Sequence, residues 1–260
     1  MSRSFRFPTE SIARRRIPRT ATSCNSLESP RSERGISWLV LVLDELVRSR
    51  SILGHPFYQA WQRGDLTREQ LAVYARVYYP HVAAFPGYLE AAIAHAPDPV
   101  VRAELARTLA DELAQPKPHM ELWLDFAEEL GLERLEVASQ TPLAATAAVI
   151  GTFQRLTGEN TANALAALYA YESQQPEVSR QKMDGLRQHY GIESPKALAY
   201  FDVHATMDTE HRRGERDALA RCLEAGASGE NLLDAASDGL QAYWQLLDAV
   251  CEEAGIPTAC

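Results

Sequence analysis

The sequence lacks the features that define membrane-spanning, disulfide-bonded and β-rich proteins. Its 260 residues contain no apolar run as long as the roughly 18 residues that a transmembrane helix needs. It has four cysteines and no Cys-x-x-Cys pair, which argues against a disulfide framework and favours a reducing cytoplasm. Runs of alternating β-branched residues bounded by Asn-Gly or Asp-Gly turns are also missing, so we expect no sheet.

Positive charge is scarce outside the N-terminus. Residues 1–35 contain eight arginines and three glutamates, and the whole chain has a net charge of −9, so residues 36–260 carry about −14. An acidic body does not suit nucleic-acid phosphates. The basic segment is rich in Ser, Thr and Pro without a hydrophobic period, which predicts a disordered segment over residues 1–35. A targeting leader and an over-extended start of the reading frame are the alternatives.

What the sequence does contain is a succession of helical signals. Hydrophobic spacing, capping residues, prolines and glycines predict nine or ten helices. They span about residues 36–50, 55–61, 67–94, 98–114, 119–130, 142–157, 160–174, 176–189, 195–225 and 229–254. No linker or repeat interrupts residues 36–260, so the predicted fold class is all-α, a single-domain helical bundle.

One predicted helix carries a stripe of metal-ligating residue types. His204, Asp208 and His211 follow one another at four and three residues. At about 100° per residue they lie within an arc of roughly 60° on one helix face. Two imidazoles and a carboxylate make half of a transition-metal site, and this donor mix suits iron or manganese better than structural zinc. The alternative is two unrelated histidines and a solvated Asp.

Further ligands are available on other helices. We expect Glu112 to end one helix and His119 to begin the next, although by themselves these two residues are better explained as a surface Glu and an N-terminal His. Glu172 is the one charged residue between Asn160 and Gln174. An isolated carboxylate in such a helix is costly to bury unless it is paired or metal-bound, and the alternative is a frayed, solvated helix end.

Together these residues form a donor set for two divalent metal ions. It comprises three carboxylates and three imidazoles, namely Glu112, Glu172, Asp208, His119, His204 and His211. Three carboxylates offset most of the charge of two such ions. An Fe/Fe, Fe/Mn or Mn/Mn centre is compatible with the set, and a centre containing iron would react with O2 and an external reductant.

This ligand order resembles that of the haem-oxygenase-like diiron oxidases, whose fold is shared with the TenA thiaminases and PqqC. Within that group the chain is most similar to the self-sacrificing 4-aminobenzoate synthases related to the chlamydial protein associating with death domains. The similarity runs from about residue 55 to the last helix. The stretches that match most closely are His55–Trp61, Glu121–Ala127 and Tyr169–Pro176.

The resemblance implies that one tyrosine of the enzyme is its own substrate. The matching residue is Tyr58, whose side chain would leave the backbone and become the ring of 4-aminobenzoate, a folate precursor. Lys182 matches the candidate amine donor, and Tyr171 and Tyr200 match two tyrosines near the metals. The resemblance also implies a homodimer. Without it, Tyr58 is an ordinary core aromatic and Lys182 a solvated helix residue.

Three other functions stay open at this point. A multi-turnover diiron oxygenase acting on an external small molecule requires the same ligands but neither Tyr58 nor Lys182. A metal-free TenA-like hydrolase requires a nucleophilic cysteine, and the folded domain offers Cys222 and Cys251 late in the chain. A non-enzymatic interaction protein is the third possibility, and no motif supports it.

Overall fold

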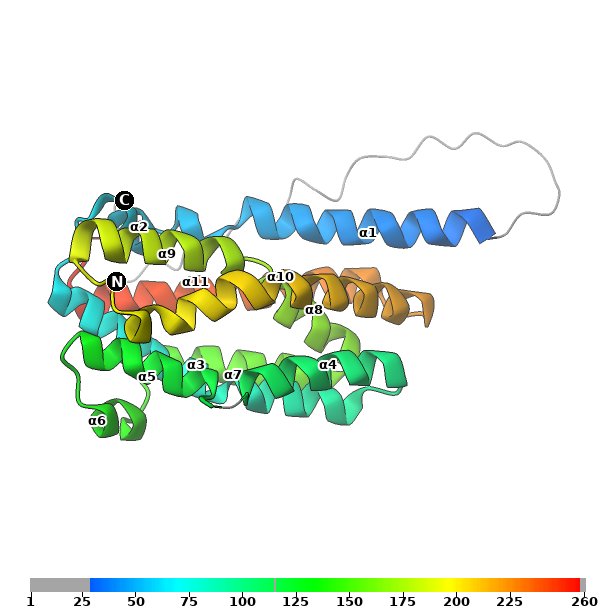
Figure 1. Ribbon diagram of the computed structural model, residues 1–260. Helices are drawn as coiled ribbons and strands as arrows, with labels where there is room; N and C mark the ends of the chain where they lie inside the picture. Colours follow the sequence, from blue (N-terminus) through cyan, green and yellow to red (C-terminus); the bar gives the residue numbers. More distant parts are fainter. Residues whose placement is uncertain (1–28, 115, 258–260) are drawn as a thin grey trace.

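The computed structural model describes residues 29–114 and 116–257, which form eleven α-helices and one short 3₁₀ helix (Figure 1). In chain order these are α1 (Ser29–Ser49), η1 (Ile52–Gly54), α2 (Pro56–Arg63), α3 (Arg68–His95), α4 (Pro99–Glu112), α5 (His119–Glu129), α6 (Arg134–Ser139), α7 (Ala144–Glu159), α8 (Thr161–Glu172), α9 (Gln175–Tyr190), α10 (Pro195–Glu224) and α11 (Gly229–Ala254). The described residues contain no strand, so the all-α prediction is confirmed. None of these helices is long and apolar enough to cross a membrane.

Helix ends follow the signals in the sequence. Thr67 and Gln70 form a capping box at the start of α3, as predicted. Gly191 ends α9 in the left-handed region at φ 64°, where a residue without a Cβ is favoured. α6 was not predicted, because six residues carry too little periodicity to be recognised.

The N-terminal boundary differs from the prediction. α1 begins at Ser29, ahead of the expected start at residue 36. Residues 1–28 lie outside the described residues, so the disordered segment stays a prediction. The predicted homodimer and the predicted lack of a nucleic-acid partner are likewise untested.

The centre of the bundle is α8. Its residues from Ala164 to Glu172 are all buried, and it packs against α7, α10 and α11. Small side chains permit this approach: a Cβ added to Gly239 of α11 would meet the carbonyl oxygen of Ala167 at 3.4 Å. Because the apolar helix α8 is buried along this length, the carboxylate of its final residue, Glu172, also lies in the protein interior.

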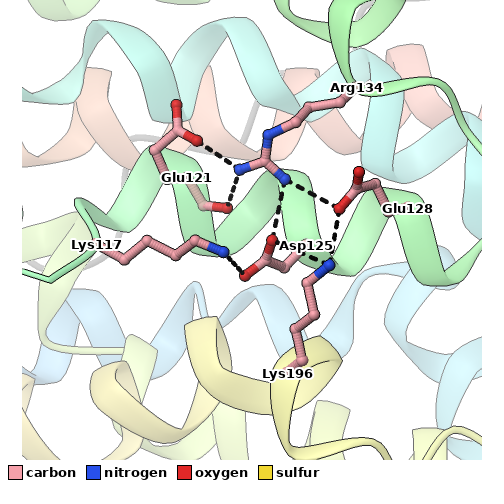
Figure 2. A network of polar contacts seen from close by, with 6 residues as sticks. All are labelled: Lys117, Glu121, Asp125, Glu128, Arg134 and Lys196. Atoms are coloured by element: carbon pink, nitrogen blue, oxygen red, sulfur yellow. Dashed lines mark hydrogen bonds and ion pairs between the residues drawn. The ribbon is translucent and has the colours of Figure 1, made fainter.

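A polar network fixes the helix that begins with His119. Asp125 of α5 is 3% exposed and accepts hydrogen bonds from Lys117 and from Arg134, the latter at 3.0 Å. Lys196 at the start of α10 lies 3.6 Å from the same carboxylate (Figure 2). The network therefore ties α5 to α6 and α10.

Two glutamates complete this network around Arg134. Its guanidinium donates to Glu121 and, at 3.0 Å, to Glu128, as Figure 2 shows. Burial opposes ionisation of Asp125, but hydrogen bonds from Lys117 and Arg134 hold its pKa below the usual value. Asp125 is therefore a buried carboxylate whose charge is compensated by protein cations.

Candidate metal centre

The six predicted ligands come together in two groups inside the bundle. Within each group the candidate ligand atoms all lie within 4.8 Å of one another, and every member is buried. The first group is Glu112, His119 and His204, and the second is Glu172, Asp208 and His211. The convergence of these residues agrees with the sequence analysis.

Helix ends and one helix face position these side chains. Glu112 is the last residue of α4 and His119 the first of α5, so a short proline-containing turn brings them together. Glu172 is the last residue of α8. The remaining three ligands lie on α10, whose predicted stripe faces the interior.

In the first group the rings are held in a ligating orientation. His204 Nδ1 donates to the carbonyl oxygen of Tyr200 at 2.7 Å, which leaves Nε2 facing Glu112 Oε1 at 3.9 Å. His119 Nδ1 lies 3.1 Å from the same carboxylate oxygen. Burial, assisted by nearby His119, lowers the pKa of His204 to about 3, so the ring is neutral, as a metal ligand must be.

In the second group a carboxylate behind the ring orients His211. Its Nε2 lies 2.8 Å from Asp111 Oδ2, while Nδ1 faces Asp208 at 3.4 Å and Glu172 at 3.5 Å. A carboxylate behind a ligating imidazole is a common arrangement in metal sites, because it fixes the ring and its tautomer. Asp111 was not predicted as a site residue, although its position directly before Glu112 was an available signal.

Polar atoms of the centre lack the partners that buried polar atoms normally have. No hydrogen bond reaches His119 Nδ1, Glu172 Oε1, Asp208 Oδ2 or His211 Nδ1. In folded proteins the large majority of buried polar atoms have a hydrogen-bond partner. Burial raises the pKa of Glu172, and raises that of Asp208 to about 7. Two cations would partner these atoms, so the residues fit a dimetal centre of iron or manganese type.

Two of the predicted tyrosines lie at a narrow cavity beside both groups. Tyr171 and Tyr200 line it together with ligand residues Glu112, Glu172, Asp208 and His204. The Tyr200 ring stacks on His204, with centroids 4.2 Å apart. Both tyrosines therefore lie beside the candidate ligands, and their role stays a prediction.

Tyr58 and Lys182 lie side by side in an aromatic region between α2, α3 and α9. Lys182 Nζ is 5.1 Å from the centroid of the Tyr58 ring and donates to Tyr74 Oη at 2.7 Å. The Tyr58 and Tyr74 hydroxyls are 3.4 Å apart. Lys182 is 2% exposed, so its interpretation as a solvated helix residue is wrong. Tyr74 was missed, because nothing in its spacing separates it from other core aromatics.

Phenol groups fill the space between this pair and the cavity. Tyr74 and Tyr78 are successive tyrosines of α3 with ring centroids 5.2 Å apart. The hydroxyl of Tyr78 lies 2.9 Å from that of Tyr171, which lines the cavity. Tyr58 is thus connected to the candidate metal centre through a succession of neighbouring phenols.

Comparison with known proteins identifies the family. Residues 72–244 match the profile of a family described as iron-containing redox enzymes. The chain is 38% identical to a 4-aminobenzoate synthase of Chlamydia muridarum over 213 residues, 82% of this chain and 89% of that protein. It is 34% identical to the 4-aminobenzoate synthase of Nitrosomonas europaea over 220 residues, 81% of this chain and 89% of that protein.

The fold comparison agrees with these matches. A TenA homologue of Pseudomonas syringae superposes with a TM-score of 0.72 at 16% identity, covering 89% of this chain and 100% of that one. The predicted haem-oxygenase-like, TenA-like bundle is therefore confirmed. The chain belongs to the iron-containing redox enzyme family and is a homologue of the 4-aminobenzoate synthases.

Proposed function

We propose that this protein is an oxygen-dependent dimetal oxygenase that makes 4-aminobenzoate from the side chain of its own Tyr58, with Lys182 as the candidate amine donor. The observation that carries the proposal is the buried Lys182 amine 5.1 Å from the Tyr58 ring centroid. An amine placed against a phenol, near a cluster of metal-ligating side chains, has no evident structural purpose. The 4-aminobenzoate synthases among its homologues give the pair a chemical one.

The two groups of ligands would each hold one divalent ion. Glu112, His119 and His204 would bind the first, and the three residues of the second group would bind the other. When bound, an Fe/Fe or Fe/Mn pair supplies the redox chemistry by which O2, with an external reductant, oxidises an organic group. Asp111 fixes the ring of His211, so that Nδ1 faces Asp208 and Glu172, with which it would hold the ion.

Tyr58 already contains the carbon skeleton of the product. Its ring and Cβ together supply every carbon of 4-aminobenzoate, so the bond to be broken is Cα–Cβ. Cβ must be oxidised from methylene to carboxylate, which requires O2. The phenol oxygen must be replaced by nitrogen, and with Lys182 as the donor its Cε–Nζ bond must also be broken. Because Tyr58 is covalently in place and fully enclosed, no substrate-binding step is needed.

The environment of Lys182 keeps its amine available as a nucleophile. Burial lowers the pKa of Lys182 to about 7, so a large fraction is neutral at physiological pH. The hydroxyl of Tyr74 accepts a hydrogen bond from Nζ and holds it beside the Tyr58 ring. Tyr74 is therefore a positioning residue for this pair.

Neighbouring phenols offer a path between Tyr58 and the cavity. Tyr74, Tyr78 and Tyr171 lie between them, in contact through rings or hydroxyls. Phenols in such contact can exchange an electron and a proton, so an oxidising equivalent at the cavity wall can reach Tyr58. The path supports the proposal because Tyr58 itself does not line the cavity.

The two cysteines that the structure describes, Cys222 and Cys251, give no support to a TenA-like hydrolase. Burial raises the pKa of Cys222, and raises that of Cys251 to about 12. A nucleophilic cysteine requires a lowered pKa.

The test is rescue of a bacterial strain that requires 4-aminobenzoate. We expect the wild-type protein to restore growth, and Tyr58→Phe and Lys182→Ala to fail. Tyr190→Phe is the matched control, because this phenol is half-buried and donates to the backbone carbonyl of Trp61 rather than to Tyr58 or Lys182. Growth supported by Tyr58→Phe would point instead to a multi-turnover oxygenase acting on an external small molecule.

A further inference from the structure

A fourth ionisable side chain continues the metal-ligating stripe of α10. Glu215 lies four residues after His211 and eleven after His204. At about 100° per residue it falls inside the roughly 60° arc of the three α10 ligands. It thus presents a carboxylate one helical turn beyond His211, on the side of the second ligand group.

Glu215 is buried and lacks a basic partner among the described residues. It is 2% exposed, and neither Oε1 nor Oε2 has a hydrogen bond. Its carboxyl group lies close enough to that of Glu172 for the two to share a proton, and the charges of His211 and Asp208 also act on it. Two buried carboxylates lose their hydration and repel each other when both are charged, so the pair requires either a bound cation or a proton on one of its members.

The charge of two divalent ions explains why a fourth carboxylate would lie beside the six ligands. Two divalent ions bring four positive charges, and Glu112, Glu172 and Asp208 offset three of them. The imidazoles ligate as neutral groups and offset none. Glu215 supplies the fourth negative charge, which makes the buried centre neutral without an added anion.

We propose that Glu215 is a fourth carboxylate ligand of the centre, binding the ion held by Glu172, Asp208 and His211. The inference rests on the dimetal site of the proposed function. A single proton shared between Glu215 and Glu172 is the competing explanation, and the experiment below separates the two.

The test compares Glu215→Gln with wild type in anaerobic titrations with Mn(II) against a competing chelator. Gln keeps the shape and hydrogen-bonding capacity of the side chain but removes its charge. We expect two ions per chain in both proteins, with the weaker-bound ion held at least tenfold less tightly in Glu215→Gln. Glu210→Gln is the matched control, because Glu210 lies on the same helix, is exposed and loses the same charge. Equal affinities in Glu215→Gln and wild type would overturn the proposal.

Thermal unfolding supplies a second readout that does not need activity. Without metal, Glu215→Gln should melt higher than wild type, because an unpaired buried carboxylate is gone. With saturating Mn(II), its gain in Tm should be smaller than that of wild type. A proton shared with Glu172 predicts the same metal-induced gain in both, and that result would also overturn the proposal.

Failure here is distinguishable from failure of the proposed function. Wild type that binds two ions but keeps Tyr58 intact after reaction would refute the synthesis of 4-aminobenzoate and leave the Glu215 test in place. Tyr58→Phe should bind Mn(II) as wild type does.

Discussion

Buried carboxylates in two parts of the bundle have opposite electrostatic surroundings. The first set is the network around Asp125, and the second is the group of Glu172 and Asp208. Asp125 is surrounded by Lys117, Arg134 and Lys196, and its pKa is held below the usual value. Glu172 and Asp208 face His211 and other carboxylates, and burial raises the pKa of both. The first set is compensated by the protein. The second retains unpartnered oxygen atoms, which is the condition of a site completed by metal cations.

The largest effect should come from removing a carboxylate of the second set. Glu172→Ala deletes a ligand, and we expect metal affinity at that position to fall more than about 100-fold, since even groups behind the ligands contribute about 10–100-fold. Production of 4-aminobenzoate should be lost with it. Metal content by elemental analysis is the measurement. Two tightly bound ions per chain in this variant would contradict the assignment of Glu172 as a metal ligand.

A smaller loss of metal affinity is expected when Asp111, which orients the ligand His211, is changed. Asp111→Asn keeps a hydrogen-bonding group beside His211 Nε2 but removes the negative charge, which weakens the hydrogen bond that orients the ring. Affinity for Mn(II) should fall about 10–100-fold. Chelator competition measures it, with Asp184→Asn of α9 as a control for the loss of one acidic group. Unchanged affinity would mean that His211 is oriented by packing alone.

The rate of product formation should depend on pH through Lys182. This buried amine has no acidic partner among the described residues, whereas the buried carboxylate of Asp125 is held by basic partners. Because burial lowers the pKa of Lys182 to about 7, the neutral fraction falls roughly tenfold for each pH unit below that value. The initial rate of 4-aminobenzoate formation in metal-loaded protein should follow this fraction. A rate that is flat between pH 5.5 and about 7 would exclude Lys182 as the amine.

The same shift has a defined sign for stability. The pKa of Lys182 is lower in the folded than in the unfolded protein, so its charged form destabilises the fold fully below pH of about 7, and this penalty is relieved as pH rises toward 10.5. Metal-free Lys182→Met should therefore melt above wild type at pH 7, with the difference narrowing at higher pH.

The smallest effect on the metal centre should come from a change in the network around Asp125, whose charge is compensated by protein cations. Arg134→Ala leaves Asp125 buried with fewer donors, which should lower the free energy of unfolding by about 1–3 kcal/mol. Mn(II) affinity should stay within about twofold of wild type, because Asp125 is not a ligand. Denaturant unfolding measures the first quantity. Arg155→Ala, which removes exposed ion pairs with Glu159 and Asp238, should cost about 0–1 kcal/mol.

The sequence predicts the ligands better than it predicts their surroundings. His204, Asp208 and His211 follow from helical periodicity, and Glu172 follows from the cost of burying a charge in an apolar helix. Asp111 and Glu215 were missed. Glu215 continues the helical stripe of α10, and Asp111 directly precedes Glu112. Whether their carboxylates reach Glu172 and His211 depends on the packing of α4, α8 and α10, which local spacing does not specify.

The placement of Tyr58 and Lys182 shows the same limit. Spacing favoured a core aromatic and a solvated lysine, and similarity to known enzymes alone indicated otherwise. Burial of Lys182 depends on α9 packing against α2 and α10, and on Tyr74 offering an acceptor to Nζ. These are tertiary contacts, so an isolated lysine in an amphipathic helix gives no sign of them.

The most direct test of the central claim is peptide mass spectrometry of the segment containing Tyr58. Protein loaded with metal is exposed to O2 and a reductant, and the peptide is compared before and after reaction. We predict that Tyr58 loses the mass of its side chain in proportion to the 4-aminobenzoate released, with at most one product molecule per chain. An intact Tyr58 in protein that has released 4-aminobenzoate would contradict the account.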